Sequence, residues 1–204
     1  MKKPISVLIV TFSALLASGD SLADQFRDGD IIFHTSSSAQ SIAIQKATHS
    51  KYSHMGIVFI RNGNPYVYEA IKTVQYTSLK KWVARGDGGH YVIKRLRDAD
   101  RVLTPEAVAK LRQVAAKFQG KPYDPTFEWS DSRIYCSELV WKIYDRGLGL
   151  PVGRLQKLSD FDLSDPIVKS KMKERYGKAI PMDETVISPG EMFSFDGLVV
   201  VAEH

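Results

Sequence analysis

The sequence contains a single cysteine, Cys136, among its 204 residues. One cysteine cannot form a disulfide bridge within the chain, so a hydrophobic core has to stabilise the fold. The chain also lacks C-x-x-C and H-x-x-x-H pairs, the spacings that are typical of zinc sites. We therefore expect no metal and no organic cofactor.

Long apolar runs and strong charge imbalance are missing as well. After the first 23 residues, no stretch approaches the 18 apolar residues of a membrane-spanning helix. The formal net charge is only +5, and the basic residues are scattered apart from 169–178, which we interpret as a solvated helix face. This pattern lacks the footprint of a nucleic-acid-binding protein, although a modest positive charge suits an anionic cell-envelope surface.

The N-terminus has the three parts of a secretory signal peptide. Lys2 and Lys3 precede an apolar run from Ile5 to Ala17, and Ser21-Leu22-Ala23 is a small-x-small cleavage site. We expect residues 1–23 to be removed and residues 24–204 to form one periplasmic domain. In that oxidising compartment a lone thiol is buried and inert, bonded to another chain, or retained for its reactivity.

A hairpin is the clearest local prediction. Residues 52–60 are rich in β-branched and aromatic side chains, Asn62-Gly63 marks a turn, and residues 66–71 form a second strand. With a two-residue loop Arg61 pairs with Asn64, which places His54 and Glu69 on the same face as diagonal neighbours. A three-residue loop or a bulge would separate them.

The remaining pattern predicts an α+β fold, because helices and strands do not alternate strictly. We expect strands at 31–33, 90–96 and 198–202, and helices at 39–48, 104–119, 136–147 and 165–176, with a capped turn starting at Ser188. Residues 73–89 are predicted to be a helix or a loop.

Cys136 lies where an aromatic approach changes into a helical pattern. Leu139, Val140, Ile143 and Tyr144 form one apolar face, which places the thiol in the first helical turn. Unpaired N–H groups and the helix dipole favour a thiolate there. The alternative is a small, buried core residue.

Acyl chemistry by a thiol needs a nucleophile, a base, a group that orients the base, and donors for the oxyanion. Cys136, His54 and Glu69 are our candidates for the first three roles. The backbone N–H of Cys136 is one candidate oxyanion donor, and Tyr52 or Tyr123 is a second. We also consider Tyr52, Tyr123 and Tyr135 as substrate-binding residues, although buried aromatic residues more often belong to the core.

Other readings of these residues remain open at this point. His34, His49 and His90 compete with His54 as the base, but none lies in an equally apolar strand with an acid on the same face. A strand histidine is often structural, and Glu69 could face solvent. Glu138 is expected to cap or pair on the helix surface.

The combined motifs resemble the permuted papain-like amidases of the YiiX type, within the NlpC-type cysteine peptidase superfamily. They are Tyr-Cys-Ser-Glu-Leu-Val at 135–140, Tyr-Ser-His-Met-Gly-Ile-Val at 52–58, Val-Tyr-Glu-Ala at 67–70 and Gly-Asp-Ile-Ile-Phe at 29–33. The resemblance covers residues 25–202. It implies a circularly permuted papain-like fold in which the helix bearing Cys136 packs against an antiparallel sheet. It also implies catalysis by Cys136, His54 and Glu69.

The resulting expectation is a periplasmic cysteine hydrolase of the amidase or peptidase type that cleaves amides in peptidoglycan-derived peptides through a thioester. One alternative keeps the triad but makes the substrate a lipid, as for a lipid acyl hydrolase or acyltransferase. Another is a non-catalytic module that binds envelope surfaces. The resemblance does not choose the substrate, because superfamily relatives act on cell-wall peptides or on lipid acyl groups.

Overall fold

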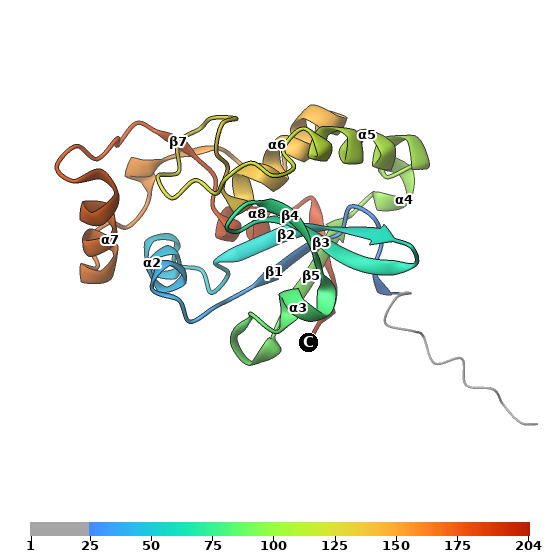
Figure 1. Cartoon of the computed structure of the whole chain (residues 1–204), viewed down its shortest axis with the longest axis horizontal. Coiled ribbons are helices and arrows are strands. Elements are labelled where there is room, and N and C mark those ends of the chain that lie inside the picture. Colours follow the sequence, from blue (N-terminus) through green and yellow to red (C-terminus); the bar gives the residue numbers. More distant parts are fainter. Residues whose placement is uncertain (1–24) are drawn as a thin grey trace, which may run out of the picture.

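A computed structural model describes residues 25–204, and the predicted signal peptide lies outside the described residues. Its centre is a six-stranded antiparallel sheet with the strand order β4-β3-β2-β1-β5-β8 (Figure 1). The strands are β1 (Ile31–His34), β2 (His54–Arg61), β3 (Asn64–Ala70), β4 (Val74–Ser78), β5 (Val92–Leu96) and β8 (Leu198–Glu203). The helices are α2 (Ala39–Thr48), α3 (Leu79–Val83), α4 (Ala99–Val102), α5 (Pro105–Ala116), α6 (Cys136–Leu148), α7 (Pro166–Tyr176) and α8 (Pro189–Ser194). The predicted α+β fold is therefore confirmed.

The predicted hairpin is formed by β2 and β3. Arg61 pairs with Asn64 and Ile57 with Tyr68, as the two-residue loop requires. Asn62 and Gly63 both have positive φ angles, 50° and 75°, which a type I′ turn needs and which these residue types tolerate. The turn chemistry thus fixes the register of the two strands that carry His54 and Glu69.

The segment 73–89 was only partly predicted. It contains strand β4, which pairs with β3 in register Tyr68–Tyr76, followed by the short helix α3 and a 3-10 turn at Asp87–Gly89. The five residues of β4 are too few for periodicity to separate a strand from a loop. A two-stranded sheet of β6 (Gln156–Lys157) and β7 (Thr185–Val186), joined to a 3-10 turn at Leu158–Asp160, was not predicted either.

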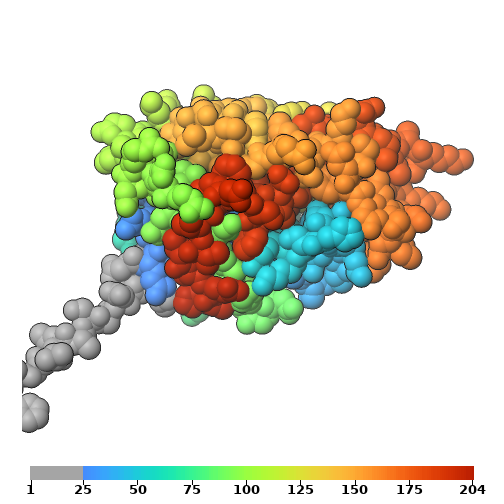
Figure 2. Space-filling model, turned by 180° about the vertical axis from the view of Figure 1, so that it is seen from behind, coloured from blue at the N-terminus to red at the C-terminus, as the bar shows by residue number. Residues whose placement is uncertain are grey.

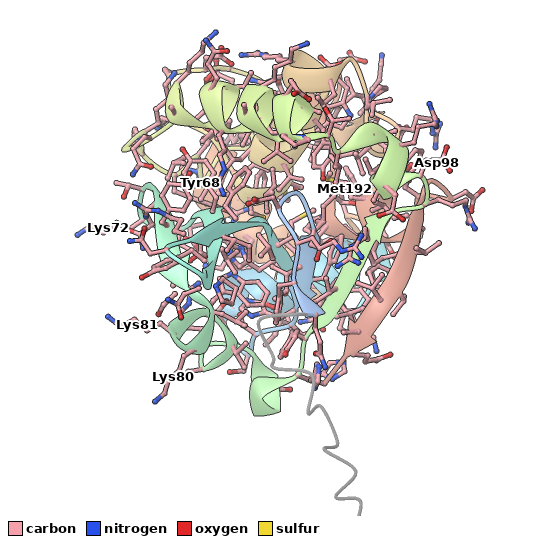
Figure 3. All side chains as sticks on the ribbon, turned by 90° about the vertical axis from the view of Figure 1, so that its right-hand side faces the viewer. Tyr68, Lys72, Lys80, Lys81, Asp98 and Met192 are labelled. Carbon is pink, nitrogen blue, oxygen red and sulfur yellow. The ribbon has the colours of Figure 1, made fainter. Side chains whose placement is uncertain are left out.

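Helix α6 lies across the sheet and packs against β2, β3 and α5 (Figure 1). Its predicted apolar face is confirmed, since Leu139, Val140, Ile143 and Tyr144 are all fully buried. Strand β3 contributes Tyr68, which is labelled in Figure 3. Its hydroxyl donates a hydrogen bond of 2.6 Å to the Ala115 carbonyl of α5. The cysteine helix is consequently held by the main core and not by local contacts alone.

Helices α2 and α7 pack together at one end of the molecule, away from the centre of the sheet (Figure 1). A small separate core of Leu158, Val168 and Met172 fills the space beside them. Among residues 25–204, no helix is long and apolar enough to cross a membrane. The α2–α7 end matters for function because it borders the helix start that carries Cys136.

Candidate active site

Cys136 is the first residue of α6, and two hydrogen bonds hold this helix start in place. Tyr135 is in an extended conformation, and its backbone N–H donates to Glu138 Oε2 over 3.3 Å. Ser137 Oγ donates to the carbonyl of Ile187 over 2.8 Å. The first backbone N–H groups of a helix have no partner inside the helix, so they are free to stabilise negative charge beside the thiol.

His54 and Glu69 meet as the hairpin register predicts. His54 is the first residue of β2, and its Nε2 lies 2.6 Å from Oε2 of Glu69, whose side chain is fully buried. Because Nε2 faces the carboxylate, Nδ1 is the ring nitrogen left for the sulfur of Cys136. The structure therefore brings the three predicted catalytic residues together in the order thiol, imidazole and carboxylate.

Arg85 is a member of this cluster that sequence reasoning did not find. Its guanidinium Nη2 lies 2.5 Å and 2.7 Å from the two carboxylate oxygens of Glu69. The pair holds Glu69 ionised and fixes its rotation. Arg85 follows α3 in the segment that was predicted only as a helix or a loop, and no spacing in the sequence connects it with Glu69.

The electrostatics of the cluster favour an imidazolium at neutral pH. Burial by itself lowers the pKa of His54, but hydrogen bonds and charge interactions with Cys136 and Glu69 outweigh burial and raise this pKa to about 9. Burial opposes ionisation of Glu69, yet its hydrogen bond with His54, together with Thr77 and Arg85, leaves the Glu69 pKa below its usual value. A cationic imidazole beside a cysteine stabilises the thiolate form.

The competing histidines lie in different surroundings. His34 is paired with His54 across β1 and β2, and its ring stacks on Trp82 with centroids 4.0 Å apart. Burial, followed by the nearby charges of His54 and Arg85, lowers its pKa to about 3, so it stays neutral. His49 and His90 form exposed contacts with Asp162 and Glu203. Neither of these exposed acids is buried as Glu69 is beside His54, and His34 has no ion pair among residues 25–204.

The structure separates the three predicted tyrosines. Tyr123 borders the same hollow as His54, and its hydroxyl accepts a hydrogen bond of 2.6 Å from Gln40. Tyr135 lines a cavity with Cys136, while its hydroxyl accepts a hydrogen bond from the Ile187 N–H. Tyr52 is buried, stacks on Phe193 at 3.9 Å, and lines neither the hollow nor the cavity.

The expectation that Glu138 lies on the helix surface is wrong. Glu138 does cap the helix, but it is fully buried and not on the surface. Burial raises the pKa of Glu138 to about 7, although its ion pair with Lys142 at 2.7 Å acts in the opposite direction. Lys142 is itself buried and also donates to Ser130 O and Asp131 Oδ1. These contacts tie the loop before Cys136 to the body of α6.

Two hollows meet at this site and differ in polarity. The first is an apolar cavity lined by Cys136 and, among others, by Ala43, Phe127, Val168 and Met172. Its volume of about 80 Å³ is several times the roughly 10–15 Å³ that one water molecule needs. The second hollow is lined by His54, Arg85, Tyr123, Gln40 and the serine side chains at 36, 38, 41 and 53. Cys136 thus faces an almost wholly apolar space, whereas the hollow beside His54 mixes polar groups with Ile44, Ala70 and Ile71.

Within residues 25–204, no group of three His, Cys, Asp or Glu side chains is arranged to hold a metal ion. The unpaired Nδ1 of His34 is packed near Trp82 and Gly86. The side chains at this site therefore do not fit a metal, and we assign no step of the reaction to one.

Comparison with known proteins identifies the family of the chain. The family described as permuted papain-like amidase enzymes, YaeF/YiiX, C92 family, matches residues 25–201. The uncharacterized protein YiiX of Escherichia coli K12 is 52% identical over 191 residues, which cover 94% of this chain and 93% of that protein. The crystal structure described as metalloprotein yiiX from Escherichia coli O157:H7 has a TM-score of 0.84 and 53% identity, covering 88% of this chain and 98% of that one.

Proposed function

The chain belongs to the C92 family of permuted papain-like amidases and is a cysteine hydrolase of the peptidase or amidase type. Within this class, we propose that it cleaves amides or esters whose acyl part is apolar, using Cys136, His54 and Glu69. The observation that supports this substrate class is the apolar cavity that opens onto Cys136. It favours the lipid-like alternative over the wall peptide that the sequence led us to expect.

In the proposed reaction, His54 has taken the proton of Cys136, and the thiolate attacks the carbonyl carbon of the substrate. His54 then donates this proton to the departing nitrogen or oxygen, and the acyl group remains on sulfur as a thioester. Water, deprotonated by His54, attacks the thioester and releases the acid and the free thiol. Glu69 orients the ring and stabilises the imidazolium, and Arg85 holds Glu69.

Two donors would stabilise the oxyanion. One is the backbone N–H of Cys136 at the start of α6. The other is the hydroxyl of Tyr123, which borders the hollow beside His54. Because this hydroxyl accepts its hydrogen bond from Gln40, its own hydrogen is free to be donated elsewhere.

The positions of the two hollows indicate where each half of the substrate would lie. The acyl group becomes bonded to Cys136, so it belongs in the apolar cavity that Cys136 lines. The leaving group receives a proton from His54, so it belongs in the second hollow, which His54 lines and which is the more polar of the two. This division supports an apolar acyl group joined to a polar amine or alcohol.

Acyl-chain length tests the proposal. A series of fluorogenic amides with increasing chain length should give rates that rise until the cavity is filled, and mass spectrometry should find the acyl group on Cys136. Ala43→Leu narrows the cavity and should shift the preference to shorter chains, whereas Ala109→Leu on the exposed surface of α5 should not. Equal rates for all chain lengths, with no change in Ala43→Leu, would contradict the acyl-cavity assignment.

A peptidoglycan-derived peptide is the second candidate, and the polar hollow supports it. Four serines, Gln40 and Arg85 there offer hydrogen-bond partners for a peptide backbone or a carboxylate. Muropeptides tested beside the acyl amides separate the two candidates. If muropeptides were hydrolysed and acyl amides were not, and if Cys136→Ala abolished this hydrolysis, the substrate would be a peptide and the acyl proposal would be wrong.

The proposed location is the periplasm, because residues 1–23 have the pattern of a signal peptide. Mass spectrometry of the protein recovered from a periplasmic fraction should give an N-terminus at Asp24. Recovery of a chain that still begins at Met1, confined to the cytoplasm, would contradict this location.

A further inference from the structure

The outer surface of α7 and the residues that follow it carry cations without partners. Lys169, Lys173 and Lys178 are exposed and form no ion pair with any residue in the described range 25–204. The acids nearby are already matched, since Asp162, Asp165 and Asp183 contact His49, Lys46 and Lys157 respectively. A net positive surface therefore remains on α7, although the surrounding loops are rich in acids.

The same three lysines surround an apolar hollow. Leu163, Met172 and Ile180 line it together with the aliphatic parts of Lys169, Lys173 and Lys178. Two of the four large apolar side chains that are exposed in residues 25–204 also belong to this region, Ile167 and Met182, with exposed fractions of 41% and 43%. We call this region, residues 163–182, the α7 surface. It forms one end of the molecule, where long side chains project into solvent (Figure 2).

The α7 surface adjoins the cavity of Cys136. Leu163 and Met172 line both the outer hollow and the inner cavity, so these two side chains form the wall between them. If an acyl chain occupied the inner cavity of about 80 Å³, a chain too long for it would leave past this wall towards α7. Lys171 and Arg175 stand at the same wall and line the inner cavity.

We propose that the α7 surface docks on a bilayer containing anionic phospholipids, from which an acyl substrate reaches Cys136. Lysine ammonium groups would contact lipid phosphates, while Ile167, Met182 and the apolar hollow would meet the boundary of the acyl chains. The apolar hollow of Leu163, Met172 and Ile180, which the three lysines border, favours a bilayer over a soluble acidic polymer, which offers no apolar layer. The delivery of substrate rests on the acyl function proposed above, but the docking itself does not.

Binding to vesicles tests the docking without any turnover. The protein for this assay is the Cys136→Ala variant of residues 24–204. It contains every element described above and lacks the apolar leader, which would itself bind lipid. It is sedimented with vesicles of phosphatidylcholine alone or with about a third phosphatidylglycerol. We expect binding only to the anionic vesicles, with affinity that falls as salt rises. Lysines near an anionic surface each contribute about fivefold, so Lys169→Gln, Lys173→Gln and Lys178→Gln together should weaken binding about a hundredfold.

The chain offers a matched control with the same change in charge. Lys72, Lys80 and Lys81 are exposed and project from the β3–α3 region into solvent (Figure 3). Their triple Lys→Gln variant should bind anionic vesicles as the parent does. Equal binding by the two triple variants would overturn the proposal, because it would leave only a general charge effect. Binding to a soluble polyanion, with none to phosphatidylglycerol vesicles, would also overturn it in favour of an acidic polymer.

A second readout separates docking from catalysis. With Cys136 intact, the α7 triple variant should hydrolyse a dispersed short-chain amide at the parent rate and lose activity about a hundredfold on a substrate embedded in anionic vesicles. An equal loss on both substrates would contradict docking by these lysines. If the parent binds anionic vesicles but hydrolyses neither substrate, the acyl function fails and the docking surface stands.

Discussion

Removing the charge of Glu69 should lower the pKa of His54 by a predictable amount. The raised value of about 9, against 6.5 for an unperturbed histidine, corresponds to about 3 kcal/mol in favour of the imidazolium. Cys136 and Glu69 supply this preference against burial. A hydrogen bond to a charged group contributes about 1.5–3 kcal/mol, so Glu69→Gln should lower the pKa by about one to two units.

The measurement is an NMR titration of the His54 ring nitrogens, which reports its protonation directly. We expect a midpoint near 9 in the parent and about 7 to 8 in Glu69→Gln. The alkaline limb of kcat/KM should move down by the same amount, because His54 has to be protonated to donate to the leaving group. Glu128→Gln, a change at an exposed acid, is the control and should leave both unchanged.

The effect of Arg85 on the pKa of His54 has to be separated from the direct effect of Glu69. In Glu69→Gln, the guanidinium loses its carboxylate partner and its positive charge also disfavours the imidazolium. The double variant Glu69→Gln, Arg85→Gln removes that cation and should recover part of the lowered pKa. A His54 midpoint that remains near 9 in Glu69→Gln would refute the assignment of Glu69 as the group that stabilises the imidazolium.

The same linkage predicts how stability depends on pH. The pKa of His54 is higher in the folded chain than in the unfolded chain, so protonation of His54 stabilises the fold. This stabilisation is complete below about pH 6.5, and it disappears as the pH rises through about 9. The loss of unfolding free energy in Glu69→Gln should therefore be largest near pH 6 and become smaller at alkaline pH. Chemical denaturation across this range measures it, and a loss that grows with rising pH would contradict the reasoning.

Three further predictions concern the fold around the site. Gly56→Ala would place a methyl group 2.5 Å from Val67 Cγ1. The resulting overpacking should lower Tm by about 3–10 °C, and an unchanged Tm would contradict this close approach. Lys142→Ala leaves Glu138 buried without its cation and should cost about 3–5 kcal/mol in denaturant unfolding, whereas adding Glu138→Gln should recover part of the loss. A long-chain fatty acid at about a hundred times its Kd should stabilise the Cys136→Ala protein by about 2.7 kcal/mol, seen as a rise in Tm that a short-chain acid does not produce.

The sequence alone determined the local structure that carries the chemistry. The apolar spacing after Cys136 predicted α6 and its buried face, because a helix imposes its period wherever one side meets a core. Asn62-Gly63 predicted the hairpin and its register, since few other residue pairs adopt two positive φ angles. Register and side-chain alternation then placed His54 beside Glu69, because these constraints are local.

Tertiary structure decided what local patterns cannot encode. Arg85 reaches Glu69 only because β4 pairs with β3 and α3 turns the chain back, and no periodicity in the sequence links these residues. Glu138 is buried because the loop before Cys136 closes over it, although its spacing is that of a surface cap. The cavity beside Cys136 is lined by residues of α2, of α7 and of the segment 186–189, which are distant in the sequence. The apolar lining of this cavity favours an apolar acyl group. No single motif predicts this lining, because packing between distant segments determines which side chains face the thiol.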